Sequence, residues 1–241
     1  MAEDFIEPTT GYWQDLHAGT PKGLQDRPPY RLGYPVRLPC GRVLVLPLRT
    51  LPDGRQAVAS LIANQASHAV VEALAGHMAA LARPLAPDLV VGVPTLGLAL
   101  AGKVAEGLGQ DRYVPLGYSR KFWYRDDLSE PVSSITSPTP GKRIFLDPNL
   151  LPLVQGRRVV LVDDAISTGS TIVAAAALLA RLGVGLAGIV VAMKQTNRWQ
   201  ATLAKADPGL PGKVLGVYGC PLFARAEDGW VPLSDTLPAV P

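Results

Sequence analysis

Two adjacent carboxylates followed by a hydroxyl-rich loop are the strongest chemical signal in the sequence. Asp163 and Asp164 follow a short aliphatic run at 159–162, and residues 167–171 read Ser-Thr-Gly-Ser-Thr. The aliphatic run has no polar alternation, which predicts a strand buried on both faces of a parallel sheet. The alanine-rich stretch 172–179 predicts a helix. The carboxylates are therefore expected at the end of a strand, and the loop at the start of a helix.

A helix start with small polar residues is suited to bind phosphate, because free backbone N–H groups and the positive end of the helix dipole lie there. Gly169 lets the backbone approach a ligand closely. Hydroxyl donors come from Ser167, Thr168, Ser170 and Thr171. Asp163 and Asp164 would repel a phosphate, so we expect them to hold hydroxyl groups of the same ligand, or Mg²⁺ bound to those hydroxyls. The pattern predicts a phosphorylated sugar as the ligand.

With its four hydrophobic residues, two acids, short spacer and Thr-Gly-Ser-Thr, this stretch resembles the phosphoribosyl-pyrophosphate (PRPP) motif of type I phosphoribosyltransferases. The resemblance implies that Asp163 and Asp164 are catalytic, hold the ribose hydroxyls, and contact Mg²⁺ indirectly through those hydroxyls or water. It implies that residues 167–171 bind the 5′-phosphate of PRPP. The implied reaction transfers the phosphoribosyl group to a nucleobase and releases pyrophosphate.

The identity of the base is left open by the sequence. The overall spacing is most similar to the adenine and xanthine phosphoribosyltransferase branch. In hypoxanthine-guanine enzymes an aspartate occupies the place of Ser167 and assists the base, which serine cannot do at neutral pH. A purine of the adenine or xanthine kind is therefore expected. The alternatives are a non-purine acceptor, or a PRPP-sensing regulator without catalysis.

A second buried strand, at 88–93, precedes Thr95, Leu96 and Gly97. In type I phosphoribosyltransferases the loop after this strand binds pyrophosphate, so the resemblance implies that role for these three residues. The stretch 97–104 nearly fits a P-loop, but Val104 lacks the hydroxyl that would bind Mg²⁺. Its Leu-Ala-Leu-Ala segment favours a helix, which predicts that Lys103 lies on a helix surface.

Residues 117–141 form a long polar stretch between two predicted strands, and a loop of this length is usually functional or disordered. The family has a mobile lid here that closes over PRPP. By resemblance, Arg120 and Lys121 are the catalytic candidates of the lid, and Arg125 is the third. A solvated charge cluster is the structural alternative.

A further strand is predicted at 185–193, and Lys194 and Trp199 follow it. Ligands bind at the carboxyl ends of strands in open α/β sheets. Lys194 resembles in position a lysine of 6-oxopurine phosphoribosyltransferases that contacts the base. Trp199 is expected either to stack on the base or to pack in the core.

The bulk composition is that of an ordinary globular protein, with 241 residues, 48% of them hydrophobic and 18% charged. The net charge of +3 is small and dispersed, so no nucleic-acid partner is expected. No signal peptide and no membrane span are predicted. The two cysteines, Cys40 and Cys220, are expected to be free thiols in the cytoplasm. Family resemblance suggests a homodimer.

The alternation of strands and helices predicts an α/β fold with a central, mostly parallel twisted sheet flanked by helices. Residues 1–64 are expected to form an irregular extension and a hairpin that turns at Asp53-Gly54. Residues 65–212 are expected to form the PRPP-binding core, with the lid at 117–141. The remainder, 213–241, is expected to hold a last strand and an irregular tail. The two end segments would form a small hood over the sugar site.

Overall fold

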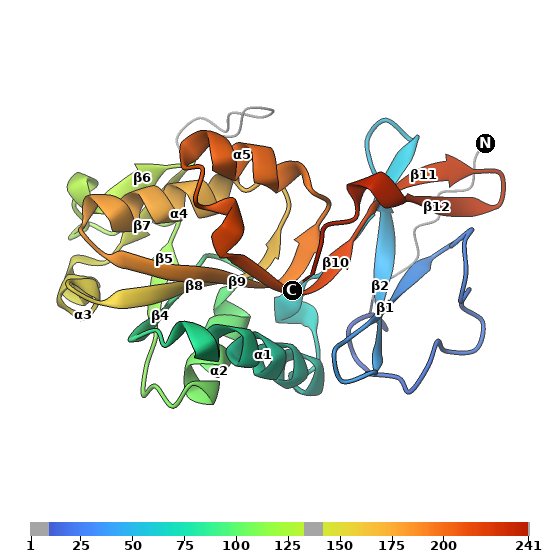
Figure 1. Cartoon of the computed structure of the whole chain (residues 1–241), viewed down its shortest axis with the longest axis horizontal. Helices are drawn as coiled ribbons and strands as arrows, with labels where there is room; N and C mark the ends of the chain where they lie inside the picture. The colour runs from blue at the N-terminus through green and yellow to red at the C-terminus, as the bar shows by residue number, and fades with distance from the viewer. Residues whose placement is uncertain (1–9, 133–141, 241) are drawn as a thin grey trace.

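The computed structural model describes residues 10–132 and 142–240 (Figure 1). The last part of the predicted lid, 133–141, lies outside the described residues. The described chain forms a seven-stranded core sheet and a separate five-stranded sheet. No helix among the described residues is long and apolar enough to cross a membrane.

The core sheet has the order β10-β9-β8-β4-β5-β7-β6, and its first five strands are parallel. The antiparallel strands β7 and β6 extend it beyond β5. This arrangement confirms the predicted α/β fold. The strands are β4 (Leu89–Gly92), β5 (Val114–Gly117), β6 (Ser129–Pro131), β7 (Arg143–Leu146), β8 (Arg158–Ile166), β9 (Gly185–Gln195) and β10 (Val214–Cys220).

Two pairs of helices cover the two faces of the core sheet (Figure 1). Helices α1 (His68–Ala82) and α2 (Leu98–Gly107) pack on one face, and α4 (Ser170–Arg181) and α5 (Arg198–Ala206) on the other. The Ser67 hydroxyl caps α1 by accepting a hydrogen bond from the Val70 N–H. The chain also has a short helix α3 (Leu151–Val154) and 3₁₀ turns at Ala63–Gln65, Arg83–Leu85, Asp126–Leu128, Pro148–Leu150, Pro211–Lys213 and Ser234–Thr236.

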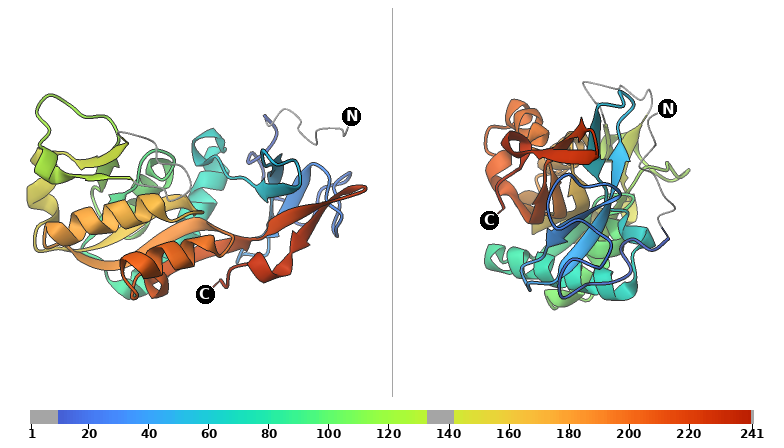
Figure 2. Two further views of the ribbon diagram at one scale, coloured as in Figure 1. Left: turned by 90° about the horizontal axis from the view of Figure 1, so that it is seen from above. Right: turned by 90° about the vertical axis from the view of Figure 1, so that its right-hand side faces the viewer.

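The five-stranded sheet lies at one end of the core and forms the hood (Figure 2). It is antiparallel, with the order β1-β2-β3-β11-β12. Its strands are β1 (Gly33–Arg37), β2 (Val43–Thr50), β3 (Gln56–Ala59), β11 (Leu222–Ala226) and β12 (Gly229–Leu233). The predicted turn is present between β2 and β3, where the Asp53 carboxylate accepts the Arg55 N–H and Gly54 has a φ of 67°.

Three parts of the chain are more regular than the sequence predicts. The sequence predicts an irregular tail, but the tail contains the hairpin β11–β12. The extension before residue 42 contains β1, and the predicted lid contains β6. Strand β12 includes Pro232, which local propensity excludes from strands but which an edge strand tolerates. Of these strands, β11 pairs with the distant strand β3, whereas β1 and β6 pair with the nearby strands β2 and β7.

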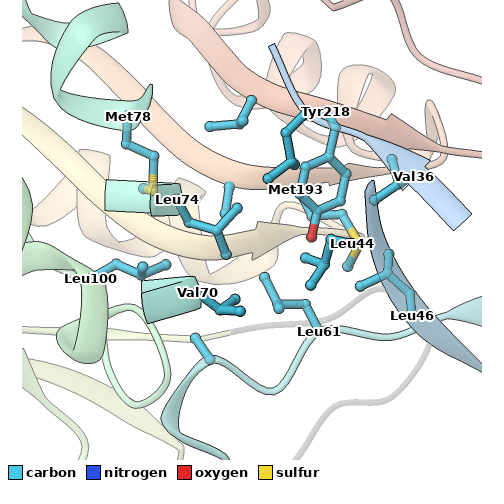
Figure 3. Close-up of a cluster of buried hydrophobic side chains, with 14 of the residues drawn as sticks. Val36, Leu44, Leu46, Leu61, Val70, Leu74, Met78, Leu100, Met193 and Tyr218 are labelled. Carbon is cyan, nitrogen blue, oxygen red and sulfur yellow. The ribbon is translucent and has the colours of Figure 1, made fainter. Parts of the chain in front are cut away.

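The hood and the core share one hydrophobic cluster (Figure 3). Leu44 and Leu61 from the hood side meet Val70 of α1 and the side chains of Met193 and Tyr218 at the ends of β9 and β10. All five side chains are buried. Burial of this apolar surface holds the hood against the carboxyl ends of the core strands.

Candidate functional site

Asp163 and Asp164 lie near the carboxyl end of β8, and both are buried, with 7% and 8% of their surfaces exposed. The strand continues to Ile166, so the two acids lie within the strand, near its end, and do not follow it. The parallel neighbour β9 fixes their height in the sheet, because Asp163 lies beside Val191. The two acids contact each other, because the Asp164 N–H donates a 2.9 Å hydrogen bond to the Asp163 carboxylate.

Burial dominates the electrostatics of this acid pair. The pKa of Asp163 is raised well above its ordinary value by burial first and then by the charge of Asp164, while Lys142 acts in the opposite direction. The pKa of Asp164 is also raised, chiefly by burial. Two adjacent buried carboxylates are unfavourable unless a ligand or partner compensates them. Such perturbed groups are typical of functional sites.

The hydroxyl-rich loop leads into α4 as predicted. Gly169 is the N-cap with a φ of 82°, a conformation that residues with a Cβ rarely adopt. A Cβ at this position would lie 2.5 Å from a methyl carbon of Leu203 in α5. The Thr168 and Ser170 hydroxyls lie 3.3 Å apart. The absence of a side chain at Gly169 therefore lets α5 pack close to the start of α4, where the first backbone N–H groups have no acceptor within the helix. The Ser170 N–H lies 3.5 Å from the Thr168 hydroxyl.

The loop between β4 and α2 packs directly against the acid pair. A Cβ on Gly97 would lie 2.6 Å from an Asp163 carboxylate oxygen and 2.7 Å from the Asp163 Cα. Thr95 is exposed in this loop, Leu96 is partly buried, and the peptide between Pro94 and Thr95 is cis. The structure thus brings the three predicted groups, 95–97, 163–164 and 167–171, to one edge of the sheet.

The near-P-loop is a helix, as predicted. Residues 98–107 form α2, and the ammonium of Lys103 lies 3.0 Å from the Glu106 carboxylate on its exposed surface.

The two predicted lid arginines form ion pairs with acids of the lid itself. Arg120 forms a 3.0 Å ion pair with Asp126, and Arg125 pairs with Asp127. Lys121 is exposed. Within the described part of the chain, neither arginine forms a hydrogen bond or ion pair with Asp163 or with residues 167–171.

Tyr118 near the start of the lid and Lys142 directly after the lid lie close to the site, and neither is predicted from the sequence. The Tyr118 hydroxyl lies 3.4 Å from the Thr171 hydroxyl in the first turn of α4. The Lys142 ammonium lies over the Tyr118 ring, 4.1 Å from its centroid. Residues 118 and 142 are far apart in the sequence and meet because β7 pairs with β5. The only available signal in the sequence is that Lys142 is a basic residue directly before β7.

The two predicted base-binding residues are buried, with 5% of Lys194 and 2% of Trp199 exposed. The Lys194 ammonium donates a 3.2 Å hydrogen bond to the Ala239 carbonyl oxygen and lies 5.9 Å from the centroid of the Trp199 ring. Burial lowers the pKa of Lys194. For Trp199 the structure favours packing over stacking, because a ring so deeply buried offers no face to a base.

The C-terminal segment therefore covers Lys194. Deletion of this segment should change the chemical reactivity of Lys194. We expect Lys194 to resist acetylation by an amine-reactive reagent in the full chain and to be modified once residues 237–241 are deleted. Peptide mass spectrometry measures both forms, and the exposed Lys103 serves as the internal control. Equal modification of Lys194 in the two chains would contradict the covering role of the segment.

Comparison with known proteins identifies the family of the chain. The family model of the phosphoribosyl transferase domain matches residues 57–210, which is more than half of the chain. An adenine phosphoribosyltransferase from Frankia casuarinae is 30% identical over 153 residues, which cover 61% of this chain and 76% of that protein. An adenine phosphoribosyltransferase from Chlorobaculum tepidum is 35% identical over 106 residues, or 44% of this chain and 54% of that protein.

A bifunctional protein PyrR from Streptomyces coelicolor is 34% identical over 127 residues, covering 51% of this chain and 56% of that protein. The chain thus spans about half the length of several of its curated relatives. Among solved structures, the adenine phosphoribosyltransferase of Giardia lamblia complexed with 9-deazaadenine superposes with a TM-score of 0.56. It is 21% identical and covers 71% of this chain and 93% of that one, so it supports the fold. From the matched residues and the fold together, the chain belongs to the phosphoribosyl transferase domain family.

Proposed function

We propose that this protein transfers the 5-phosphoribosyl group of PRPP to a nucleobase and releases pyrophosphate. The observation that carries the proposal is the meeting of an acid pair, a helix start and a second loop at one sheet edge. Residues 167–171 offer hydroxyl and N–H donors to the 5′-phosphate. The acids accept hydrogen bonds from the ribose hydroxyls. The loop 95–97 lies against Asp163, on the side where the diphosphate would lie.

The reaction breaks the bond from ribose C1 to the diphosphate oxygen and forms a bond from C1 to a ring nitrogen of the base. Positive charge develops on the ribose, and negative charge on the diphosphate. Catalysis of such a step depends mainly on positioning and electrostatics. Asp163 and Asp164 lie where they stabilise the ribose charge once they are ionised.

The donor set also fits Mg²⁺ that arrives with PRPP. The described residues contain no cluster of three or more His, Cys, Asp or Glu side chains that would hold a metal by themselves. Mg²⁺ typically binds through one or two carboxylates together with substrate phosphates. Bound to PRPP, Mg²⁺ would neutralise charge on the diphosphate, while Asp163 and Asp164 orient the ribose hydroxyls.

A purine of the adenine kind is the acceptor we favour. The adenine phosphoribosyltransferases among the matched relatives support this choice. Ser167 also supports it, because it stands where hypoxanthine-guanine enzymes carry an aspartate. The homodimer remains a prediction from the family resemblance, and the cytoplasmic location remains a prediction from the two cysteines.

The proposal is tested by pyrophosphate release from PRPP and Mg²⁺ over a panel of adenine, xanthine, hypoxanthine, guanine, uracil and orotate. We expect release that depends on one purine, and the corresponding nucleotide as the second product. Pyrophosphate release with orotate or uracil alone would show that the acceptor is a pyrimidine and not a purine. Tight PRPP binding without turnover on any base would favour a PRPP-sensing regulator, and absence of PRPP binding would refute the proposal.

A further inference from the structure

The last described residues, 237–240, lie across the carboxyl ends of β9 and β10 and form a C-terminal strap. Pro238 is the buried residue of this strap, and the other three are exposed. A Cβ on Gly219, near the end of β10, would have its three nearest atoms in the strap. These are the Pro238 carbonyl oxygen at 3.0 Å, the Pro238 Cγ at 3.1 Å and the Val240 Cγ2 at 3.3 Å. The strap therefore packs closely on the edge strand of the core sheet.

The strap is anchored where it begins and held by few contacts beyond that point. The Thr236 hydroxyl, directly before the strap, accepts a 2.8 Å hydrogen bond from the backbone of β11. Within residues 10–132 and 142–240, the one hydrogen bond to residues 238–240 comes from the Lys194 ammonium, 3.2 Å from the Ala239 carbonyl oxygen. Displacement of the strap from its anchor onward would thus break a single hydrogen bond of the described chain.

Lys194 is an incompletely paired cation beneath the strap. Its residue is 5% exposed, and no carboxylate in the described ranges forms an ion pair with it. The ammonium carries three N–H donors, and in those ranges one of them has an acceptor. A buried charge without a full set of partners is unfavourable. A ligand that brings further acceptor atoms would therefore be a better partner for Lys194 than the strap.

The position of Lys194 connects the strap to the proposed site. Lys194 lies beside Ile166, the last residue of β8 before the hydroxyl-rich loop. Its ammonium lies 5.9 Å from the centroid of the Trp199 ring. A Cβ on Gly169, in that loop, would lie 3.4 Å from both the Cβ and the carbonyl oxygen of Trp199. The strap thus closes over a cation that adjoins the loop assigned to the 5′-phosphate.

We infer that the C-terminal strap is autoinhibitory. It holds the Lys194 ammonium on a main-chain carbonyl, and it must be displaced before this cation meets an acceptor atom of the nucleobase. The inference rests on the proposed function for the identity of the ligand. The closed strap reduces the fraction of molecules that are competent to bind the base, so it weakens the apparent affinity by that fraction.

Gly219→Val displaces the strap in the full chain, because the added atoms point at the strap and valine suits a strand. A chain that lacks residues 237–241 tests the same displacement without a change in β10. The matched control is Gly185→Val in β9, where an added Cβ would lie 3.5 Å or more from its nearest atoms. Circular dichroism confirms the folding of each protein.

Two measurements report on the strap. Acetylation of Lys194 requires no catalysis, and it should be faster in Gly219→Val and in the shortened chain than in the wild type and the control. The KM for the purine, measured at saturating PRPP, should fall by about 10- to 100-fold in the same two proteins, as for release of one hydrogen bond to a charged group. The KM for PRPP should stay unchanged.

The outcomes distinguish this inference from the proposed function. Faster acetylation together with an unchanged or higher KM for the purine would overturn autoinhibition and leave the proposed function in place. Unchanged acetylation in both Gly219→Val and the shortened chain would show that no strap covers Lys194, which also overturns the inference. Absence of turnover on every base, in the wild type and in both strap variants, would refute the proposed function and the inference with it.

Discussion

Asp163→Asn combined with Asp164→Asn is expected to lower turnover by about a thousandfold or more, a loss comparable with removal of a strong electrostatic contact at other active sites. The same double variant should be more stable than the wild type. Both effects have one cause, because the two carboxylates are buried and their charge is unfavourable until the ligand binds. Asparagine keeps the shape and removes the charge.

The stability gain should depend on pH. Burial raises the pKa of both acids in the folded chain, so the wild type loses stability as the pH rises from the usual carboxyl range near about 4 through the raised values. The double variant lacks this loss, and its advantage should grow with pH. Thermal unfolding at pH 5 and pH 8 measures it, with each kcal/mol corresponding to about 2–4 °C in Tm.

A matched control is Asp15→Asn with Asp111→Asn, which makes the same change in charge at two exposed positions. It should keep full turnover and show no growing advantage with pH. Retained turnover in the Asp163 and Asp164 double variant would contradict the assigned roles. A double variant less stable than the wild type at pH 8 would contradict the electrostatic explanation.

Gly97→Ala adds one methyl group to the site, and we expect this substitution to lower both stability and pyrophosphate binding. The added Cβ would lie 2.6–2.7 Å from the Asp163 carboxylate oxygen, the Asp163 Cα and the Val93 carbonyl oxygen. Two of these three atoms belong to the backbone, so the loop itself must move away from β8. We expect a loss of about 1–3 kcal/mol in the free energy of unfolding, typical of overpacking. Displacement of the loop should also weaken pyrophosphate binding.

The matched control is Gly76→Ala on α1, where an added Cβ meets no atom within 4 Å. Alanine favours a helix over glycine by about 1 kcal/mol, so this variant should be slightly more stable and fully active. Urea unfolding and pyrophosphate titration compare the two. If Gly97→Ala binds pyrophosphate as tightly as Gly76→Ala, the loop 95–97 does not hold the diphosphate.

The parts of the site that could be predicted are those whose signal is local. Asp163, Asp164 and residues 167–171 follow one another along a strand, a loop and a helix start, so their order in the sequence is their order in space. The loop 95–97 was placed by the family resemblance. Its contact with Asp163 arises because β4 and β8 are parallel neighbours.

The parts that could not be predicted depend on contacts between distant residues. The hood tail forms strands because Leu222 pairs with Val58, across most of the chain. Lys142 reaches Tyr118 only after β7 pairs with β5. The burial of Trp199 beneath Gly169 likewise arises from the packing of α5 on α4. No local pattern in the sequence predicts these contacts.

The most direct measurement is a crystal structure of the full chain with PRPP and Mg²⁺. We expect the 5′-phosphate within hydrogen-bond distance of the backbone N–H groups at 168–171, and the ribose hydroxyls on Asp163 and Asp164. We also expect the diphosphate beside the loop 95–97. A sugar phosphate bound away from the start of α4, or ribose hydroxyls that do not contact either acid, would contradict it.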